Sequence, residues 1–376
     1  MKTAELIHDW NEDPTEPPHP LEFDDETLRD GLQCPSVTDP PLEKKAEILR
    51  LMAQLGIQSA DIGLPGAGGS VNEHVAELLR VIRDEKLPIE PNCAARTVIQ
   101  DIEPVIEICQ KVGHPLQVST FIGSSAIRQF TEDWSLDTLL KISEKALRFA
   151  RENDLSVMYV TEDTTRATPE TVEALYGLAI DLGAERLCVC DTVGHATPSG
   201  VRKLIQFVAG VVAKKGAEGR VKIDWHGHMD RGLGILNSIA AFEAGAHRVH
   251  GTGLGIGERA GNTPMDLLLV NLKLLGWIDH DLTRLGEYCH KVAEAVEVPI
   301  PYNYPVFGSD AFETGTGVHA AAVIKALRKG DTDLANRVYS GVPSDLFGLR
   351  QRIRIGPMSG KSNVTFWLEE NDIAAD

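Results

Sequence analysis

The sequence predicts an α/β fold, namely a (β/α)8 TIM barrel followed by a small, mainly helical C-terminal subdomain. From residue 21 onward, short apolar or β-branched stretches alternate with longer segments of helical periodicity, which is typical of βα units in a parallel sheet. Eight such units fit into about 250 residues, the usual size of a TIM barrel. No G-x-G-x-x-G turn leads from the first predicted strand into a helix, which disfavours a doubly wound dinucleotide-binding sheet.

Eight strands and eight helices are predicted in alternation. The strands are expected at residues 22–28, 57–63, 89–95, 116–122, 156–162, 186–191, 221–228 and 247–252. The helices that follow them are expected at residues 42–55, 71–86, 101–112, 136–153, 169–182, 198–214, 232–244 and 264–275. Four residues are predicted to cap helix starts, because serine and threonine side chains accept hydrogen bonds from the first turn: Ser70, Ser135, Thr168 and Thr197. The two threonines also precede a proline at the first helical position.

The segments on either side of the barrel have a different character. Residues 1–20 hold four prolines among acidic residues, so we expect an N-terminal arm without regular structure. The barrel domain is expected at residues 21–276 and the C-terminal subdomain at residues 277–376. Within that subdomain, the pattern predicts helices at 281–295, 309–329 and 331–340, then a β-like stretch at 352–356.

Composition excludes several classes of protein. Apolar residues make up 43% and charged residues 24% of the chain, as in ordinary globular proteins, which argues against a disordered or fibrous protein. Acidic residues outnumber basic ones 55 to 37, and the net charge of −18 disfavours binding to nucleic acid. No apolar run is long enough to cross a bilayer and no signal peptide begins the chain, so we expect a cytoplasmic protein without a membrane partner. The six cysteines form no C-x-x-C pair and are expected to be reduced and mostly buried.

The seventh predicted strand carries two histidines with the spacing of a metal-chelating pair. His226 and His228 are two residues apart, and side chains on a strand alternate between its faces, so both imidazoles share one face. Asp30 at the end of the first strand and Asn262 after the eighth enter the same region, because strands seven, eight and one are neighbours in a closed barrel. Such a site suits Zn, Mn, Mg or Co. Taken singly, the histidines could be satisfied surface residues, Asp30 a surface carboxylate and Asn262 a helix cap.

These residues belong to motifs that resemble a known superfamily. LRDG at 28–31, H-x-H-x-D-x-G at 226–232 and GIGERAGN at 255–262 are similar to the barrel lyases and synthases that include 2-isopropylmalate, homocitrate and citramalate synthases and 3-hydroxy-3-methylglutaryl-CoA lyase. The resemblance covers about residues 21–371. It implies a metal-dependent enzyme with the ligands Asp30, His226, His228 and Asn262.

The same resemblance assigns roles to further residues. Arg29 would stabilise the enolate or oxyanion as a fixed cation. EDTTR at 162–166 and DTVGHATP at 191–198 resemble two more motifs of the family, so that Glu162 would line the substrate pocket and Thr192 would bind the carboxylate of a 2-oxoacid. Gln33 and Arg96 are expected to help position ligands. Apart from Arg29, each of these residues could instead form a local structural hydrogen bond or ion pair.

Residues of the C-terminal subdomain favour the synthase branch over the lyase branch. The lyases are expected to carry a cysteine in the glycine loop near the end of the barrel, and the stretch at 251–266 has none. TGVH at 316–319 and SGK at 359–361 resemble synthase motifs, which implies that His319 is the catalytic acid or base and Tyr339 its supporting residue. In this family the subdomain reaches the active site of the partner chain, so the resemblance implies a homodimer with His319 supplied in trans.

The resemblance therefore implies an acyltransferase that condenses acetyl-CoA with a 2-oxoacid, most like the 2-isopropylmalate synthase of leucine biosynthesis. Homocitrate or citramalate synthase remains an alternative, because the segments after His228 and around His319 depart from the family pattern. A retro-aldol lyase of the 3-hydroxy-3-methylglutaryl-CoA lyase type is a further alternative, and a non-catalytic metal- or metabolite-binding protein is a third. The sequence leaves the oxoacid and the native metal open.

Overall fold

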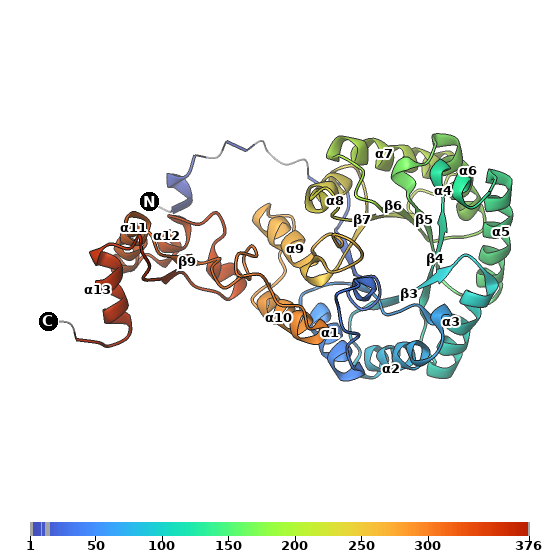
Figure 1. Ribbon diagram of the computed structural model, residues 1–376. Helices are drawn as coiled ribbons and strands as arrows, with labels where there is room; N and C mark the ends of the chain where they lie inside the picture. The colour runs from blue at the N-terminus through green and yellow to red at the C-terminus, as the bar shows by residue number, and fades with distance from the viewer. Residues whose placement is uncertain (1–2, 9, 12–15, 375–376) are drawn as a thin grey trace. The chain divides into compact units, whose positions relative to one another are not determined.

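The computed structural model describes residues 3–8, 10–11 and 16–374. Eight parallel strands close into a barrel in the order of the sequence, with β8 paired to β1. The helices surround this ring of strands (Figure 1). The predicted TIM barrel is therefore confirmed. The chain divides into two compact units: Thr15–Asp279 with Lys291–Val298, which contains the barrel, and Met1–Pro14, His280–His290 and Pro299–Asp376. The predicted domain boundaries at residues 20 and 276 stay a prediction.

All eight predicted strands form. They are β1 (Glu22–Asp25), β2 (Ser59–Asp61), β3 (Glu90–Arg96), β4 (Gln117–Gly123), β5 (Val157–Glu162), β6 (Arg186–Asp191), β7 (Lys222–Gly227) and β8 (Arg248–Gly251). The eight predicted helices are α1 (Leu42–Gln54), α2 (Ser70–Glu85), α3 (Ile99–Val112), α5 (Leu136–Glu152), α6 (Pro169–Asp181), α7 (Pro198–Lys214), α8 (Gly234–Glu243) and α9 (Met265–Leu274). One short helix, α4 (Ala126–Thr131), was not predicted.

Three of the four predicted helix caps are confirmed. The side chains of Ser135, Thr168 and Thr197 each accept a hydrogen bond from the backbone N–H three residues later. The prediction for Ser70 is wrong. Gly69, with φ at +60°, occupies the cap position of α2, and Ser70 is already the first helical residue. The glycine pair before Ser70 lets the chain enter the helix with a left-handed backbone, which L side chains rarely adopt.

The side chains of β7 alternate between the two faces of the strand. Ile223 and Trp225 are buried and alternate with Asp224 and His226, so the two pairs point to opposite faces of the strand. The predicted H-x-H pair therefore shares the face that also carries Asp224.

The lower part of the barrel interior is filled by charged side chains. Asp224 is fully buried and lies 2.8 Å from Arg186 Nη1 and 2.6 Å from Arg248 Nε. Its other neighbour is His250, whose Nε2 is 3.1 Å from Oδ2. Burial opposes ionisation, but Arg186 and Arg248 hold the pKa of Asp224 well below its ordinary value. The carboxylate is therefore charged at neutral pH, and the stability it contributes is lost only when the pH falls below about 4.

Asp224→Asn should destabilise the barrel strongly, because it leaves two buried arginines without their shared carboxylate. The expected loss is about 3–5 kcal/mol in the free energy of unfolding, measured by chemical denaturation at neutral pH. The matched control is Asp181→Asn, which removes an exposed partner of Lys215 and should cost less than about 1 kcal/mol. Equal shifts for the two variants would show that the buried network contributes no more than a surface pair.

The other unit is mainly helical, as predicted, but its elements are shorter. Its described α-helices and strands are β9 (Glu313–Thr314), α11 (Gly317–Arg328), α12 (Thr332–Arg337), β10 (Arg352–Ile353) and α13 (Lys361–Glu370). A further helix, α10 (Leu285–Val296), begins in this unit and ends in the barrel unit. The helix predicted for 309–329 is wrong over its first part, because Glu313 and Thr314 pair with β10 in a parallel two-stranded sheet. Such a pairing between segments about forty residues apart is invisible to local periodicity.

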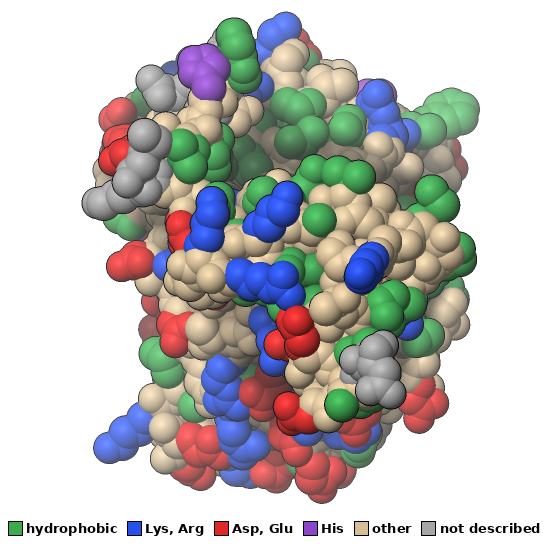
Figure 2. Space-filling view, turned by 90° about the vertical axis from the view of Figure 1, so that its left-hand side faces the viewer, with side chains coloured by type: hydrophobic (Ala, Val, Ile, Leu, Met, Phe, Trp, Pro, Cys, Tyr) green, Lys and Arg blue, Asp and Glu red, His purple; other side chains and the backbone are tan. Residues whose placement is uncertain are grey.

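The predicted N-terminal arm lies partly outside the described residues, including Pro14. Within the described part, Thr3–Leu6 forms a 3-10 helix that contacts α12, so this segment is more regular than predicted. None of the six cysteines, all of which lie among the described residues, forms a disulfide bond, and four of them are buried. No helix among the described residues has the length and apolar character needed to cross a bilayer. On the face drawn in Figure 2, Lys and Arg side chains lie across the middle, and acidic side chains are most numerous toward the lower edge, where some basic side chains lie as well.

Candidate active site

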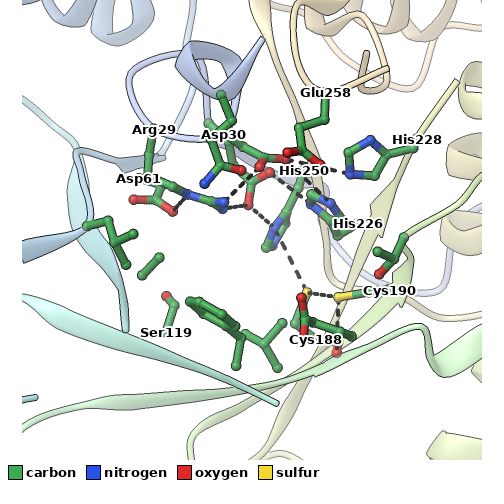
Figure 3. A pocket seen from close by; sticks show the side chains of 18 of the residues that line it. Arg29, Asp30, Asp61, Ser119, Cys188, Cys190, His226, His228, His250 and Glu258 are labelled. Atoms are coloured by element: carbon green, nitrogen blue, oxygen red, sulfur yellow. Dashed lines mark hydrogen bonds and ion pairs between the residues drawn. The ribbon is translucent and has the colours of Figure 1, made fainter. Parts of the chain in front are cut away.

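A pocket opens at the carboxyl ends of the barrel strands, where TIM-barrel enzymes place their chemistry (Figure 3). Each predicted site residue of the barrel unit except Arg96 and Asn262 lines this pocket. Asp30 and Gln33 come from the loop after β1, Glu162 from the end of β5, Thr192 from the loop after β6, and His226 and His228 from β7 and the residue beyond it. The remaining polar lining is Glu26, Arg29, Asp61, Ser119, His250, Glu258 and Arg259.

The geometry of three side chains fits a divalent metal. Oδ2 of Asp30 is 3.7 Å from Nε2 of His226 and 3.8 Å from Nε2 of His228. These distances are too long for hydrogen bonds. They are close to the roughly 3.0–3.4 Å that separates two ligands of one ion when each bond measures about 2.1 Å. All three side chains are nearly buried, so an ion between them would be held by the protein on several sides.

Asn262 completes this group from the loop after β8. Its side chain is buried, and its amide nitrogen donates a hydrogen bond to Oδ2 of Asp30. Its oxygen, Oδ1, is buried and has no hydrogen-bond partner among the described residues, and the same holds for Nδ1 of His228. A half-turn of the amide exchanges nitrogen and oxygen, which ordinary structures do not distinguish, and brings Oδ1 to the side of Asp30. Gly257 leaves the space for Asn262, because a Cβ there would lie 2.0 Å from Oδ1.

The two histidines differ in their electrostatic surroundings. Burial opposes the charged form of His226, but the adjacent carboxylate of Glu26, 2.8 Å from Nδ1, raises its pKa to about 9. Burial and the neighbouring His226 lower the pKa of His228 to about 4. In the absence of an ion, the pair therefore carries one positive charge at neutral pH.

Arg29 is a fixed cation on the wall of the pocket. Its guanidinium lies 2.6 Å from Asp61, 2.8 Å from Asp30 and 3.1 Å from Glu26, each through a different nitrogen. Burial opposes its charge, but these carboxylates raise the pKa of Arg29 well above its ordinary value. Three carboxylates thus hold the planar fork in one orientation, as Figure 3 shows for Arg29, Asp30 and Asp61.

Glu162 and Thr192 lie together at the ends of β5 and β6. Burial raises the pKa of Glu162, whose carboxylate is 4.0 Å from Arg128. The hydroxyl of Thr192 accepts a hydrogen bond of 2.8 Å from the backbone N–H of Asp163, which leaves its own hydrogen available to a ligand. The side chains can therefore offer an acid and a hydroxyl donor to a molecule in the pocket.

Arg96 lies outside the lining of the pocket. Its side chain is 66% exposed and forms two hydrogen bonds of 2.8 Å with the carboxylate of Asp101 at the start of α3. The guanidinium is therefore engaged in the local ion pair that the sequence left open as the alternative to ligand positioning.

His319 and Tyr339 belong to the C-terminal unit. Their rings are stacked, with centroids 4.1 Å apart, so the structure brings these two predicted residues together. His319 lies in the first turn of α11, and both side chains are substantially exposed. An exposed imidazole supported by a tyrosine ring remains accessible to a reacting group.

Several pocket residues were missed by the sequence reasoning. Asp61 ends β2, and Glu26 and His250 lie at the ends of β1 and β8. A search for charged or imidazole side chains at the ends of all eight predicted strands would have found them. The apolar wall, formed by Leu64, Ala94, Phe121, Met158 and Val160, had no comparable signal, because apolar residues in barrel strands usually belong to the core.

These features define a TIM-barrel protein with a candidate divalent-metal site at the carboxyl ends of its strands. The HMGL-like family model matches residues 21–292. The chain therefore belongs to the HMGL-like family.

Two curated relatives and one solved structure illustrate the similarity. Homocitrate synthase AksA of Methanopyrus kandleri is 33% identical over 92% of this chain and 81% of that protein. The probable 2-isopropylmalate synthase of the same organism is 33% identical over 93% of this chain, which spans 65% of that protein. The crystal structure of the HMG-CoA lyase of Bacillus subtilis superposes with a TM-score of 0.61 at 19% identity, over 76% of this chain and 97% of that one. The structural similarity concerns the fold.

Proposed function

We propose that the protein is a metal-dependent acyltransferase that condenses acetyl-CoA with a 2-oxoacid to give a 2-alkylmalate-type acid and CoA. The observation that carries the proposal is the convergence of Asp30, His226 and His228 beside Arg29 at the mouth of the barrel. Membership of the HMGL-like family and similarity to synthases over more than nine-tenths of the chain support it.

Asp30, His226, His228 and Asn262 would hold the cation, whether Zn, Mn, Mg or Co. When bound, it supplies Lewis-acid polarisation of the ketone of the oxoacid. The unpartnered buried Oδ1 of Asn262 supports this fit, because buried polar atoms normally have partners.

The other pocket residues would act on the substrate itself. Thr192 would donate a hydrogen bond to the oxoacid carboxylate, and Gln33 would help to orient the acid. Arg29 would stabilise the negative charge that develops when the enolate attacks the ketone, because its fork is already fixed in a buried site. Glu162 would donate or accept a proton at the mouth of the barrel, and its raised pKa suits this role.

His319 would remove a methyl proton from acetyl-CoA, assisted by the stacked Tyr339. We propose that the partner subunit of a homodimer supplies these two residues to the barrel site. The enolate then forms a carbon–carbon bond to the ketone, and hydrolysis of the thioester releases the acid and CoA.

The pocket wall favours a 2-oxoacid with an apolar side chain. Leu64, Ala94, Phe121, Met158 and Val160 form that wall, and the two arginines of the pocket, Arg29 and Arg259, are both paired with carboxylates. A second substrate carboxylate, as a homocitrate synthase would require, has no free cation among the lining residues. The reaction is therefore most like that of a 2-isopropylmalate synthase.

A panel of 2-oxoacids tests the proposal. Full-length protein loaded with Zn or Mn should release free CoA thiol from acetyl-CoA in the presence of an oxoacid whose side chain is isopropyl or methyl, and far less with a carboxyethyl side chain. Cleavage of a 3-hydroxyacyl-CoA without any oxoacid-dependent thiol release would instead assign the protein to the lyases. If neither assay detects any turnover, the result would favour a non-catalytic binding protein.

Mixing two inactive variants tests the shared site. His319→Ala should keep the metal site, and Asp30→Ala should keep an intact His319. If chains re-pair at random, half of the dimers combine the two variants and have one working site each, so about a quarter of wild-type activity should return. Lack of recovery despite demonstrated subunit exchange would place His319 in the site of its own chain or outside the chemistry.

A further inference from the structure

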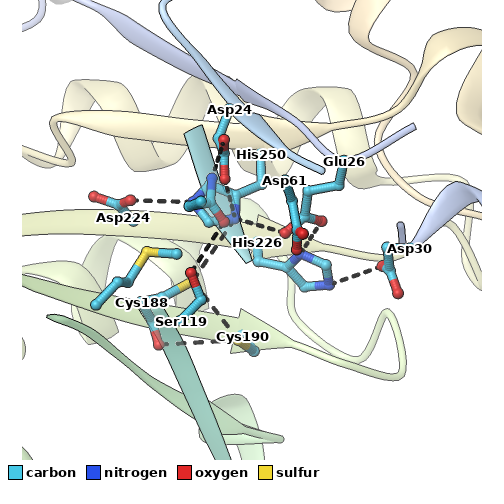
Figure 4. Close-up of polar contacts among 12 residues, drawn as sticks. Asp24, Glu26, Asp30, Asp61, Ser119, Cys188, Cys190, Asp224, His226 and His250 are labelled. Carbon is cyan, nitrogen blue, oxygen red and sulfur yellow. Dashed lines mark hydrogen bonds and ion pairs between the residues drawn. The ribbon is translucent and has the colours of Figure 1, made fainter. Parts of the chain in front are cut away.

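Glu26 is a buried carboxylate that joins three groups of the pocket and that the proposed chemistry leaves without a role. It follows β1 directly and is 3% exposed. Its Oε2 lies 2.8 Å from Nδ1 of His226. Its Oε1 lies 3.0 Å from Nδ1 of His250 and 3.1 Å from Nη2 of Arg29. Figure 4 shows Glu26 and Asp30 on opposite sides of the His226 ring.

The contact with His226 decides which ring nitrogen is free. A neutral imidazole has one N–H donor and one lone pair. If Nδ1 donates its hydrogen to Glu26, the lone pair lies on Nε2, the nitrogen that faces Oδ2 of Asp30 at 3.7 Å. The carboxylate thereby selects the tautomer that can bind a cation between His226, Asp30 and His228.

Among the described residues, none gives His228 an equivalent contact. Its Nδ1 is buried without a hydrogen-bond partner, although its Nε2 faces Asp30 as that of His226 does. Of the two histidines, only His226 thus has a carboxylate in direct contact with the ring nitrogen that faces away from Asp30.

The position of Glu26 is itself fixed by a contact with His250. His250 lies between two carboxylates, with Nδ1 at 3.0 Å from Glu26 and Nε2 at 3.1 Å from Asp224. A ring whose two nitrogens both face carboxylate oxygens donates from both of them. Asp224 is in turn fixed by Arg186 and Arg248. The chain of contacts anchors Glu26 to the charged interior of the barrel.

The distances separate this cluster from a second metal site. Glu26, His226 and His250 could hold an ion by the proximity of their ligand atoms. Their contacts of 2.8 and 3.0 Å, however, are direct contacts between ring nitrogen and carboxylate oxygen, whereas the 3.7 and 3.8 Å distances around Asp30 leave space for an ion. The geometry therefore distinguishes Glu26, which contacts the histidine rings directly, from Asp30, which lies at the separation expected between two ligands of one ion.

We infer that Glu26 is the positioning residue of the metal site: it orients His226 and keeps the lone pair of Nε2 directed at the cation. This inference rests on the metal site of the proposed function. It also explains why one carboxylate contacts both His226 and Arg29, since a single group then fixes a ligand and the fixed cation relative to each other.

The test measures metal affinity of the full-length protein without reference to turnover. Glu26→Gln keeps the shape of the side chain but removes its charge and permits the amide to turn. The Kd for Zn²⁺, measured by competition with a chromophoric chelator, should rise about 10–100-fold, and the absorption spectrum of the Co²⁺-loaded protein should change. Glu26→Asp should also weaken binding, because the shorter carboxylate cannot reach His226 and Arg29 together.

The matched control is Glu243→Gln, which alters a partly buried ion pair with Arg202 on α7 and should leave the Kd unchanged. An unchanged Kd in a folded Glu26→Gln variant would overturn the inference. Two equivalents of Zn²⁺ per wild-type chain, with one lost in Glu26→Gln, would also overturn it, because Glu26 would then be a ligand. If no thiol release is found with any oxoacid, the Kd series still decides whether Glu26 supports a metal site.

A measurement on the wild-type protein covers the case in which the variants do not fold. Long-range ¹H–¹⁵N spectra of histidine-labelled, Zn²⁺-loaded protein report which ring nitrogen carries the hydrogen. His226, assigned by the signals missing in His226→Ala, should be protonated at Nδ1 and bound to metal through Nε2. The opposite assignment would contradict the role of Glu26.

Discussion

Replacing His226 or His228 with alanine should remove most of the bound metal and abolish turnover while the barrel stays folded. Each variant deletes one of the two imidazoles whose Nε2 lies within 3.8 Å of Oδ2 of Asp30. These side chains lie at the mouth of the barrel, above the charged network of Asp224, so their loss should not disturb the packed interior. Metal content after dialysis, measured by atomic spectroscopy, checks the prediction.

The matched control for these variants is His290→Ala, which changes an exposed histidine on α10. It should retain both metal and activity. Full metal occupancy in the His226→Ala, His228→Ala double variant would place the cation elsewhere and remove the basis of the proposed site.

Arg29→Lys should leave metal binding nearly intact and lower kcat by a factor on the order of 10²–10³, as expected for loss of one oxyanion donor. An ammonium group cannot reach Asp61, Asp30 and Glu26 together, as three nitrogens of the guanidinium do. The remaining donors would no longer be fixed toward the developing charge. Steady-state kinetics at saturating acetyl-CoA and oxoacid, with the metal content of the same sample, measure the effect.

Arg202→Lys serves as the control for Arg29→Lys. The substitution keeps the positive charge beside Glu243, and neither Arg202 nor Glu243 lines the pocket. Its kcat should equal that of the wild type. An unchanged kcat in Arg29→Lys would reassign Arg29 to a structural role in holding Asp30 and Asp61.

The barrel could be predicted from the sequence because its signals are local. Each strand and helix repeats a short pattern, and the capping residues Ser135, Thr168 and Thr197 mark helix starts by contacts within three residues. The approach of Asp30 to His226 also followed, because barrel closure makes β8 the only strand between β1 and β7.

The features that were missed depend on contacts between distant residues. Glu26 meets His226 and His250 across the interior of the barrel, and nothing near residue 26 in the sequence indicates either partner. The β9–β10 pairing shortened a predicted helix for the same reason. Ser70 differs, since there the glycine before it competed locally for the cap position.

The most direct test of the central claim follows the carbon atoms of the acetyl group. Metal-loaded protein would be incubated with acetyl-CoA labelled with ¹³C at both acetyl carbons and with the oxoacid that gives the fastest thiol release. The account predicts one product that contains both labelled carbons, with the former methyl carbon bonded to the former ketone carbon and the former thioester carbon present as a carboxylate. This product should form in equal amount to free CoA and be absent after removal of the metal. Labelled acetate as the only product, or condensation that persists in metal-free protein, would contradict it.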